Sequence, residues 1–330
     1  MRRLRILTWH VHGSYLYYLT QAPHEFYLPV KPDKPEGYGG KLPGFSWGKN
    51  VHDIPADEVR HGSFDAILFQ SRRNYVEDQY EILSTEQRQL PRLFLEHDPP
   101  REHPTDTGHV VNDSGLLLIH VTHFNQLMWD SGITPTRVIE HGVMVPQNVT
   151  YSGEIPKGIV VVNGLRSRGR RLGADIFEVV SQQVPLDLVG MGSEAIGGLG
   201  EISHAELPSF LVRYRFFFHP IRYTSLGLAV CEAMMLGLPI VGLATTELPV
   251  VVKNGISGYV HTDLHWLIQR MQLLITDPAQ ALALSQNAQH HAQQHFSIER
   301  FIQDWNAAFE QAIALASQAP HSLTLTPLSP

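Results

Sequence analysis

The sequence predicts an α/β protein of two domains, each built on a doubly wound parallel sheet. Short apolar runs alternate with polar or helix-periodic segments along the first half of the chain. A break rich in Pro and Gly at residues 145–157 interrupts this pattern, and the alternation restarts after it. Such alternation is typical of parallel sheets, and 330 residues suit two domains of ordinary size. We expect domains at residues 1–150 and 151–316, then a disordered tail rich in Pro, Ser and Thr at residues 317–330.

Composition narrows the class of protein. A hydrophobic content of 43% with a charged content of 17% is that of a globular chain. The formal net charge of -7 argues against bulk electrostatic binding to nucleic acid or to an anionic membrane. Cys231 is the single cysteine, which fits a reducing compartment, and we expect a cytoplasmic location. The sequence predicts neither a signal peptide nor a membrane-spanning helix, because no apolar run reaches the roughly eighteen residues that a span needs.

The first half predicts five buried strands, one helix and two long loops. The helix, at residues 76–90, lies between two of the strands and has helical periodicity. The loops, at residues 28–55 and 99–113, have no clear period, and loops of that length are usually functional or mobile. The predicted strands are at residues 4–9, 64–70, 93–96, 116–121 and 137–140.

The second half repeats the alternation. A helix is predicted at residues 171–183, and residues 264–316 are expected to be mainly helical because they are rich in Ala, Gln and Leu. The predicted strands are at residues 159–162, 186–189, 216–219, 239–242 and 258–261.

The most informative stretch is at residues 216–260. An apolar strand ends at Pro220, a loop follows, and Gly227 opens a helix that carries Glu232. A helix N-terminus at the carboxyl end of a parallel strand is a ready anion site, and a glycine there lets a phosphate approach the backbone. Glu232 is placed to accept hydrogen bonds from a ribose diol. The alternative is an ordinary strand, loop and helix with a helix-stabilising acid.

This stretch resembles the donor-site signature of the GT-B glycosyltransferases, most of all the retaining family four, glycosyl transferases group 1. That pattern reads P-S-x-x-E-G-F-G-L-x-x-x-E-A-M-x-x-G-x-P-V-V. The matching positions are Pro220, Gly227-Leu228, Glu232-Ala233-Met234 and Gly237-Leu238-Pro239. The resemblance implies that Glu232 holds the ribose of the nucleotide. It also implies two Rossmann-like domains with a cleft between them, and a C-terminal helix at residues 296–316 that crosses back over the first domain.

One departure from the pattern concerns the donor sugar. The first Glu of the family pattern, which contacts hydroxyl groups of the sugar, falls on Thr224, and the following G-F falls on Ser225-Leu226. Thr224 and Ser225 can still supply hydroxyl hydrogen bonds. The sugar is therefore left unidentified by the sequence.

An arginine-rich segment at residues 163–173 follows the first predicted strand of the second domain. Four arginines at Arg166, Arg168, Arg170 and Arg171 would pack poorly in a core but clamp a diphosphate well. A solvated basic turn or an RNA contact is the alternative. By resemblance, Arg166 matches the family's Arg, and either Arg170 or Arg171 replaces its Lys. Gly190 belongs to a segment that resembles the family's V-G-x-G.

The first domain supplies the acceptor side. Its first strand leads to Gly13, where the family usually has a glycine pair, so this match is partial. Residues 90–100 resemble the family's P-x-V-x-x-x-H-D segment, which implies that His97 faces the reaction centre with Asp98 beside it. Residues 245–249 are similar to its G-G-x-x-E loop, and the similarities together span about residues 4–308.

The resemblance implies a hexosyltransferase that moves a sugar from a nucleotide-diphosphate sugar, with retention and without a metal ion or other cofactor. The sequence has no D-x-D motif, so we expect arginines and the helix N-terminus to meet the phosphate charge. A zinc site among the first domain's histidines is a less favoured alternative, because no Cys or H-E-x-x-H helix accompanies them. The acceptor is a sugar, a lipid-linked molecule or a small molecule, and peripheral membrane contact stays open. The alternatives are a nucleotide-sugar epimerase and a non-catalytic nucleotide-sugar-binding protein.

Overall fold

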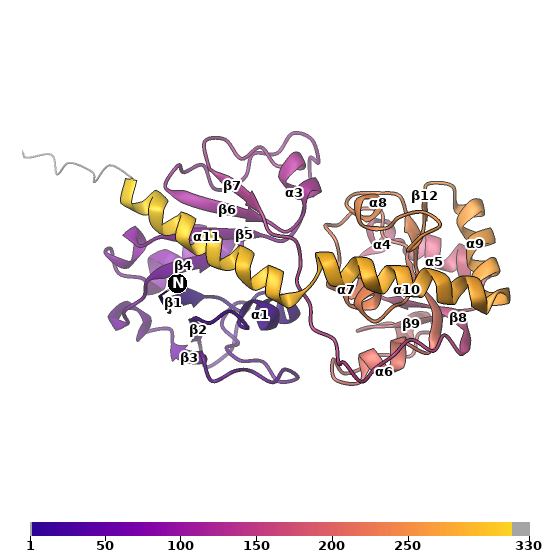
Figure 1. Ribbon diagram of the computed structural model, residues 1–330. Coiled ribbons are helices and arrows are strands. Elements are labelled where there is room, and N and C mark those ends of the chain that lie inside the picture. Colours follow the sequence, from indigo (N-terminus) through magenta and orange to yellow (C-terminus); the bar gives the residue numbers. More distant parts are fainter. Residues whose placement is uncertain (1, 319–330) are drawn as a thin grey trace, which may run out of the picture.

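The computed structural model describes residues 2–318 and contains two parallel β-sheets with helices packed against them (Figure 1). The strands of the first sheet are β1 (Arg5–Thr8), β2 (Glu25–Val30), β3 (Val51–Pro55), β4 (Ala66–Phe69), β5 (Arg92–Glu96), β6 (Leu116–His120) and β7 (Thr136–Val138). Those of the second are β8 (Ile155–Val161), β9 (Leu186–Val189), β10 (Tyr214–His219), β11 (Ile240–Leu243) and β12 (Gly258–His261). The predicted pair of doubly wound parallel sheets is confirmed.

Both sheets change direction beside their first strand. The first sheet has the order β3-β2-β1-β4-β5-β6-β7, and the second has the order β12-β11-β10-β8-β9. The order therefore reverses between β1 and β4 in the first sheet and between β8 and β10 in the second. Open α/β sheets bind ligands outside the carboxyl ends of their strands at such a switch point. A ligand-binding site is therefore expected among the loops that follow these four strands.

The helices vary in length, and several have a side-chain cap that explains where they begin. Thr122, Asp263 and Asp277 accept hydrogen bonds from backbone N–H groups at the starts of α3, α9 and α10 respectively. The α-helices are α1 (Gly13–Leu19), α2 (Gln79–Ile82), α3 (His123–Met128), α4 (Gly169–Leu172), α5 (Ala174–Ser181), α6 (Leu207–Leu211), α7 (Leu228–Met235), α8 (Leu248–Val251), α9 (Leu264–Thr276), α10 (Pro278–His295) and α11 (Ile298–Gln318).

The predicted loop at residues 28–55 is wrong at both ends, because β2 and β3 occupy them. Pro29 lies inside β2 and Pro55 ends β3, and these prolines masked the strand pattern. Pairing overrides the propensity, since β2 lies between β1 and β3 in register with both. Only the middle of the predicted loop, between Val30 and Val51, lacks strands.

The predicted helix at residues 76–90 is interrupted. A π-helical turn at Asn74–Asp78 continues into α2, which ends at Ile82, and a separate 3₁₀ turn follows at Gln87–Gln89. The cause is a second helix start inside the segment. Ser84 N–H donates to Gln87 Oε1 at 2.9 Å, and Gln87 N–H donates to Ser84 Oγ at 3.2 Å. This reciprocal pair is a capping box, which begins a new turn and ends the old one.

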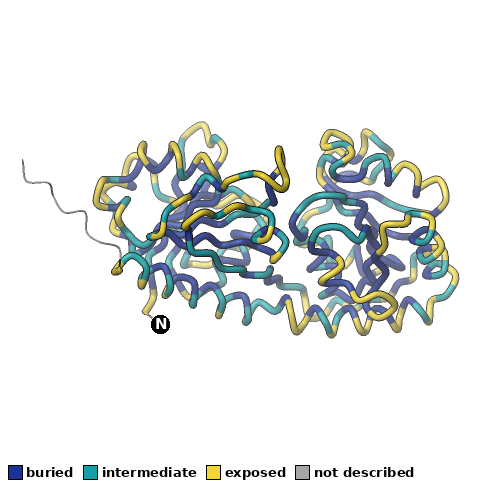
Figure 2. Tube along the Cα trace, turned by 90° about the horizontal axis from the view of Figure 1, so that it is seen from above, coloured by how far each residue is buried: buried dark blue, intermediate teal, exposed yellow. Residues whose placement is uncertain are grey.

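The C-terminal helices connect the two domains. Helix α10 packs on α7 in the second domain, whereas α11 packs on β5, β6 and α1 in the first (Figure 1). The view in Figure 2 shows both helices running along one side of the two lobes. The predicted helix that crosses back over the first domain is thus confirmed. Helix α11 includes Ser317 and Gln318, and the rest of the predicted tail, residues 319–330, lies outside the described residues.

The chain passes between the domains at two places that contact each other. The first crossing follows His141, and the second lies between α10 and α11. Val143 N–H donates to the carbonyl of Phe296 at 3.0 Å, and Arg300 Nη2 donates to the carbonyls of Glu140 at 2.9 Å and His141 at 2.5 Å. The domain limits at residues 150 and 316 stay a prediction.

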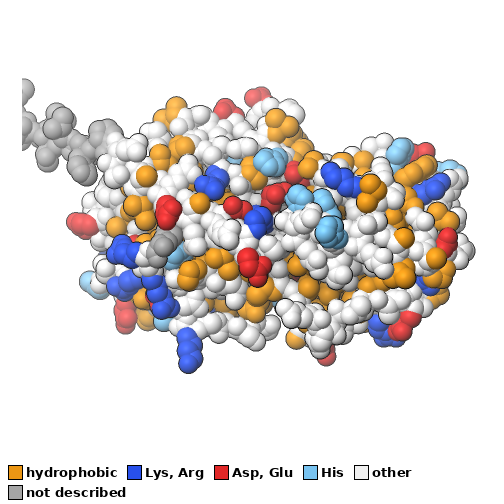
Figure 3. All heavy atoms as spheres, viewed as in Figure 1, with side chains coloured by type: hydrophobic (Ala, Val, Ile, Leu, Met, Phe, Trp, Pro, Cys, Tyr) orange, Lys and Arg blue, Asp and Glu red, His pale blue; other side chains and the backbone are white. Residues whose placement is uncertain are grey.

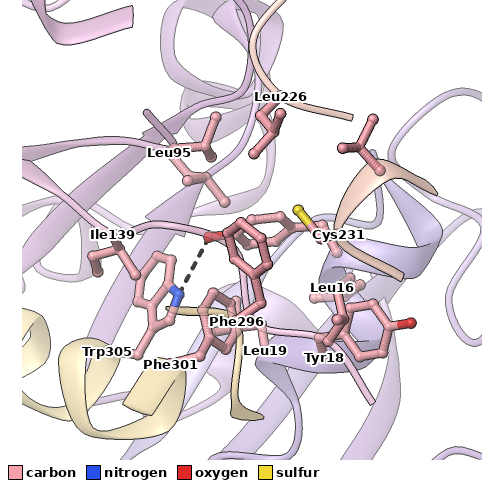
Figure 4. Close-up of a cluster of buried hydrophobic side chains, with 14 of the residues drawn as sticks. Leu16, Tyr18, Leu19, Leu95, Ile139, Leu226, Cys231, Phe296, Phe301 and Trp305 are labelled. Atoms are coloured by element: carbon pink, nitrogen blue, oxygen red, sulfur yellow. Dashed lines mark hydrogen bonds between the residues drawn. The ribbon is translucent and has the colours of Figure 1, made fainter. Parts of the chain in front are cut away.

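A buried cluster fills the junction beneath these crossings (Figure 4). It joins residues of α1 to Phe301 and Trp305 of α11, and it reaches Leu226 and Cys231 of the second domain. Trp305 Nε1 donates to the hydroxyl of Tyr15 at 3.3 Å. The two domains therefore share apolar packing on one side of the cleft between them.

Candidate active site

His97 lies at the carboxyl end of the first sheet, directly after β5. Its Nε2 donates to Gln70 Oε1 at 3.3 Å. The Gln70 amide is fixed in that orientation, because its Nε2 donates to Thr8 Oγ1 and to the carbonyl of Trp9, both at 2.8 Å. The proton of a neutral His97 is therefore on Nε2, and Nδ1 is left as an acceptor.

Burial lowers the pKa of His97 well below the usual 6.5, and His12 and His141 lower it further. The ring of His12 lies 4.1 Å from that of His97, centroid to centroid. A second proton on His97 would be poorly solvated and close to two other imidazoles. At neutral pH His97 is thus an uncharged hydrogen-bonding group.

The two other predicted residues of the first domain are Asp98, which follows His97 in the chain, and Gly13, at the start of α1. The carboxylate of Asp98 pairs with Arg101, and its carbonyl accepts from Trp129 Nε1 at 2.8 Å. Gly13 is the first residue of α1, and a Cβ there would lie 3.2 Å from the ring of Phe45. Asp98 therefore orients Arg101, and Gly13 leaves room at the start of the helix.

In the second domain, helix α7 begins at the carboxyl end of β10. Its N-cap is Gly227, which is extended, and none of the described side chains caps the helix. Apart from Gly227 itself and its two chain neighbours, no heavy atom of residues 2–318 lies within 4 Å of where a Cβ of Gly227 would be. The first turn, which starts at Leu228, thus presents uncapped N–H groups to an open space.

The loop before α7 is held from both domains. His141 Nε2 donates to the carbonyl of Leu226 at 2.6 Å, and Thr246 Oγ1 donates to the carbonyl of Ser225 at 3.4 Å. Leu226 and Ser225 are buried, whereas Thr224 is half-buried. The two hydrogen bonds thereby hold the backbone at Ser225 and Leu226 in place. Of the three side chains, that of Thr224 is the most accessible to solvent.

The arginine-rich loop packs directly against the loop that precedes α7. The carbonyl of Arg171 accepts from the N–H groups of Arg222 at 3.0 Å and Tyr223 at 3.3 Å. Burial lowers the pKa of the Arg171 guanidinium, with Arg101 and Arg168 lowering it further and Asp98 opposing them. Arg171 forms no ion pair with any of residues 2–318. Its charge is therefore unpaired among the described residues, and it is near enough to Arg101 and Asp98 of the first domain for their charges to affect its pKa.

The remaining predicted residues of this loop point elsewhere. Arg170 Nη1 is 2.5 Å from Asp175 Oδ2, and Asp175 also accepts two hydrogen bonds from Arg222 at 2.6 and 2.8 Å. Arg166 Nη1 donates to the carbonyl of Ala195 at 3.3 Å. Gly190 has φ +135°, and a Cβ there would crowd the carbonyl of Val162. Arg171 thus remains unpaired beside the loop that leads into α7, whereas Gly190 is needed because its backbone packs closely against Val162.

Glu232 faces the first domain from α7. Tyr18 in α1 donates its hydroxyl hydrogen to Glu232 Oε1 at 2.7 Å, and His204 Nε2 lies 3.8 Å from the same oxygen. Glu232 lines a cavity of about 350 Å³ between the domains, together with Tyr17 and Phe45. Sequence reasoning missed Tyr18 and His204, because neither belongs to a motif.

Two further contacts close the cleft. Tyr223 donates its hydroxyl hydrogen to the carbonyl of Pro100 at 2.8 Å. Glu247 of the second domain accepts from the N–H of Phe124, at the start of α3, at 2.8 Å. Burial raises the pKa of Glu247, and the hydrogen bond from Phe124 opposes that shift. The structure is therefore a closed arrangement, in which the loop after β10 contacts the loop after β5.

Together these groups form a site with three parts. The open N-terminus of α7, with Arg171 and its neighbours, suits a diphosphate, and the Glu232 carboxylate suits a diol. The neutral His97 lies across the cleft from them. Among residues 2–318, no group of three or more His, Cys, Asp or Glu side chains is arranged to hold a metal ion. None of the described helices is both long and apolar enough to cross a membrane.

Comparisons with known proteins bear on the fold and on the family that the chain resembles. Residues 192–291 match the family model described as glycosyl transferases group 1. A search of curated proteins finds no match. Among solved structures, Anabaena HepE in complex with UDP and glucose has a TM-score of 0.68 at 16% identity, covering 93% of this chain and 100% of that one.

Two further structures agree over nearly their whole length. Sucrose-phosphate synthase from Thermosynechococcus elongatus has a TM-score of 0.66 at 17% identity, covering 95% of this chain and 100% of that one. A glycosyltransferase from Rickettsia africae has a TM-score of 0.66 at 12% identity, covering 95% and 99%. These likenesses show the GT-B fold and confirm it as predicted. With the family match, they support a group 1 glycosyltransferase.

Proposed function

We propose that this chain, which has the GT-B fold and a group 1 glycosyltransferase segment, transfers a sugar from a nucleotide-diphosphate sugar to an acceptor. The observation that carries the proposal is the convergence of the α7 N-terminus, Arg171 and Glu232 at the switch point of the second sheet. His97 lies opposite them, at the carboxyl end of the first sheet. A nucleotide-sugar donor is supported by the similarity to Anabaena HepE, whose structures are complexes with UDP and with UDP-glucose.

The groups present fit transfer without a metal ion. As the glycosidic C–O bond to the diphosphate breaks, negative charge grows on the leaving phosphate. The uncapped N–H groups of α7 and the guanidinium of Arg171 stabilise that charge. Arg168 and Arg101 add to the positive field on either side of the cleft. We propose retention of the anomeric configuration, with the leaving phosphate accepting the proton of the acceptor.

His97 acts as a positioning hydrogen-bonding group and not as a cation. Because burial keeps its pKa low, it faces the sugar or the acceptor uncharged at neutral pH. Its Nδ1 accepts a hydrogen bond from a hydroxyl group, while Nε2 stays bonded to Gln70. Because His97 is uncharged, the electrostatic attraction for the diphosphate comes from Arg171 and the N-terminus of α7.

The acceptor is a sugar, a lipid-linked molecule or a small molecule, and a cytoplasmic location stays a prediction. Nucleic acid is not an expected partner, because the net charge is -7 and acidic and basic side chains are interspersed on the face in Figure 3.

The donor site is tested by a matched pair of arginine variants. Arg171→Ala should weaken nucleoside diphosphate binding about tenfold or more, because a hydrogen bond to a charged group is worth about 1.5–3 kcal/mol. Arg170→Ala should change it by less than about twofold, since Arg170 is held by Asp175. Calorimetric titration with UDP, GDP and ADP measures both, and Glu232→Ala should match Arg171→Ala. Equal effects of the two arginine variants would contradict the assignment.

A non-catalytic nucleotide-sugar-binding protein is the second candidate, favoured by Thr224 at the position where the family has Glu. A transferase releases nucleoside diphosphate only when an acceptor is present. An epimerase changes or hydrolyses the donor alone, and a binding protein does neither. Incubating the chain with nucleotide sugars, with and without an acceptor panel, separates the three.

A further inference from the structure

Tyr18 is the first-domain residue that bonds to Glu232, and we infer that it is a positioning residue for that carboxylate. Its hydroxyl group holds one carboxylate oxygen, so that the other faces the ribose of the donor. This inference rests on the proposed function. It adds a first-domain residue to a nucleotide site otherwise built from the second domain.

The geometry around the hydroxyl of Tyr18 fixes its direction. It lies 2.7 Å from Glu232 Oε1 and 3.3 Å from His204 Nε2. A carboxylate only accepts hydrogen bonds, so the phenol donates to Glu232 and accepts from His204. Burial and the neighbouring carboxylate both raise the pKa of Tyr18, which keeps the phenol protonated. Tyr18 from the first domain and His204 from the second thus form a small hydrogen-bond network with Glu232.

The ring of Tyr18 cannot easily move away. It is 1% exposed and lies beside Leu16 and Leu19 in the junction cluster, with its hydroxyl group pointing out of that cluster (Figure 4). Leu16 and Leu19 are fully buried, so the helix that carries the ring is anchored. The hydroxyl group is therefore presented by a rigid element, as a positioning group requires.

Glu232 keeps one oxygen for a ligand. Its side chain is 12% exposed and lines the cavity of about 350 Å³ between the domains. Oε1 is engaged by Tyr18, whereas Oε2 forms no hydrogen bond with any of residues 2–318. A carboxylate has about four acceptor positions, so it can bind Tyr18 and a ribose hydroxyl group together. Without the bond to Tyr18, the carboxylate would rotate more freely and pay more entropy on binding.

The arrangement also links ribose binding to the closed state. Tyr18 belongs to the first domain and Glu232 to the second, so their hydrogen bond exists only while the domains are together. A ribose that binds an oriented Glu232 favours the closed form over an open one. Nucleotide binding and domain closure thereby support each other.

The test combines Tyr18→Phe with ligands that lack the ribose hydroxyl groups. The wild type is first titrated with UDP, GDP and ADP, and the tightest ligand is then compared with its 2′,3′-dideoxy form. Tyr18→Phe keeps the ring and its packing, and should weaken binding of the natural nucleotide about tenfold. It should change binding of the dideoxy form by less than about twofold, because the group that Tyr18 positions has nothing to bind there.

Tyr214→Phe is the matched control. Tyr214 donates its hydroxyl hydrogen to Asp187 at 2.8 Å, at the start of β10 and away from the carboxyl ends of the strands. Tyr214→Phe removes the same kind of hydrogen bond, and it should leave the affinities for the natural and the dideoxy nucleotide unchanged. Equal weakening of the natural and dideoxy nucleotides by Tyr18→Phe would overturn the inference, because a merely structural loss affects both. If the wild type binds no nucleoside diphosphate, the proposed function fails as well.

Discussion

At the scale of single residues, the buried histidines set the response of the protein to acid. Burial lowers the pKa of His120 to about 3, with His109 adding to the shift, and it lowers those of His141 and His219 to about 4. An unfolded histidine takes up a proton near pH 6.5, but these stay neutral in the folded state down to their lower pKa values. The unfolded state therefore binds more protons as the pH falls. The stability that these histidines contribute is present above pH 6.5 and is lost between pH 6.5 and their folded-state pKa values, about 4 for His141 and His219 and about 3 for His120.

His120 offers a direct test, because neither of its ring nitrogens has a partner among residues 2–318. His120→Leu should reduce the loss of stability as the pH falls below 6.5, by about 1.4 kcal/mol per pH unit between pH 5.5 and 4, which is the limiting value for one such histidine. It should also raise the melting temperature at pH 7, because a buried unpaired polar group is removed. Thermal unfolding at a series of pH values measures both effects.

The same substitution at His265, which is exposed, is the control and should leave the pH dependence as in the wild type. A His120→Leu variant with the full wild-type pH dependence would show that His120 titrates normally in the folded state.

Sequence motifs made Gly227, Glu232 and His97 candidate site residues, because these residues occupy fixed places in a known pattern, and their roles stay a prediction. The choice between Arg170 and Arg171 depended on Asp175, whose ion pair with Arg170 involves no pattern in the sequence. Tyr18 was missed for a related reason. It is a buried aromatic residue on α1, and only its contact with the other domain distinguishes it from a core residue.

At the scale of elements, the junction of α4 and α5 determines how the arginine loop meets the loop before α7. Gly173 ends α4 with φ +82° and begins α5. A Cβ at Gly173 would overlap the carbonyl oxygen of Pro220, just before the loop that leads into α7. The close approach of these two backbones requires glycine at this position.

Gly173→Ala should therefore both destabilise the protein and weaken nucleotide binding, because Pro220 and the loop after it must shift. Gly169→Ala is a close control: Gly169 also has a positive φ, +60°, but no described heavy atom lies within 4 Å of its added Cβ. It carries the backbone strain of about 1 kcal/mol without the clash. Melting temperatures and nucleotide titrations of the two variants should differ clearly, and similar values would refute the role of the contact.

Long apolar runs predicted the central strands well, because β6 and β10 are buried along their whole length. Strands β2 and β3 were missed, because their prolines hide a pattern that only pairing with β1 completes. The broken helix at residues 74–89 shows the opposite error. Helical periodicity continues through residues 76–90, although the capping box of Ser84 and Gln87 starts a new turn within them.

At the scale of the whole molecule, α11 belongs to the first domain in space although it is the last described element and follows the second domain in sequence. Phe301, Trp305 and Phe309 are buried, and Trp305 bonds to Tyr15 of α1. The family resemblance predicted this crossing. The contacts that close the cleft, from Tyr223 and Glu247, were not predictable, because they depend on how the two domains meet.

Trp305→Ala should destabilise the protein by about 3–5 kcal/mol, the usual cost of removing a large buried aromatic side chain. Glu310→Ala, on the exposed face of the same helix, should change stability by less than about 0.5 kcal/mol. Denaturant unfolding followed by tryptophan fluorescence and by circular dichroism measures the difference. A small effect of Trp305→Ala would mean that α11 is not needed to hold the first domain.

The two crossings between the domains lie against each other, joined by the hydrogen bond from Val143 to Phe296. Crossings far apart would clamp the domains at two points, but crossings at one place act as a single pivot. In any rotation about a pivot, displacement grows with the lever arm. His141 lies close to the pivot in the chain, so its bond to the carbonyl of Leu226 is among the least disturbed. In such a rotation the backbone that leads into α7 would move least, and the side of the cleft farthest from the crossings would move most.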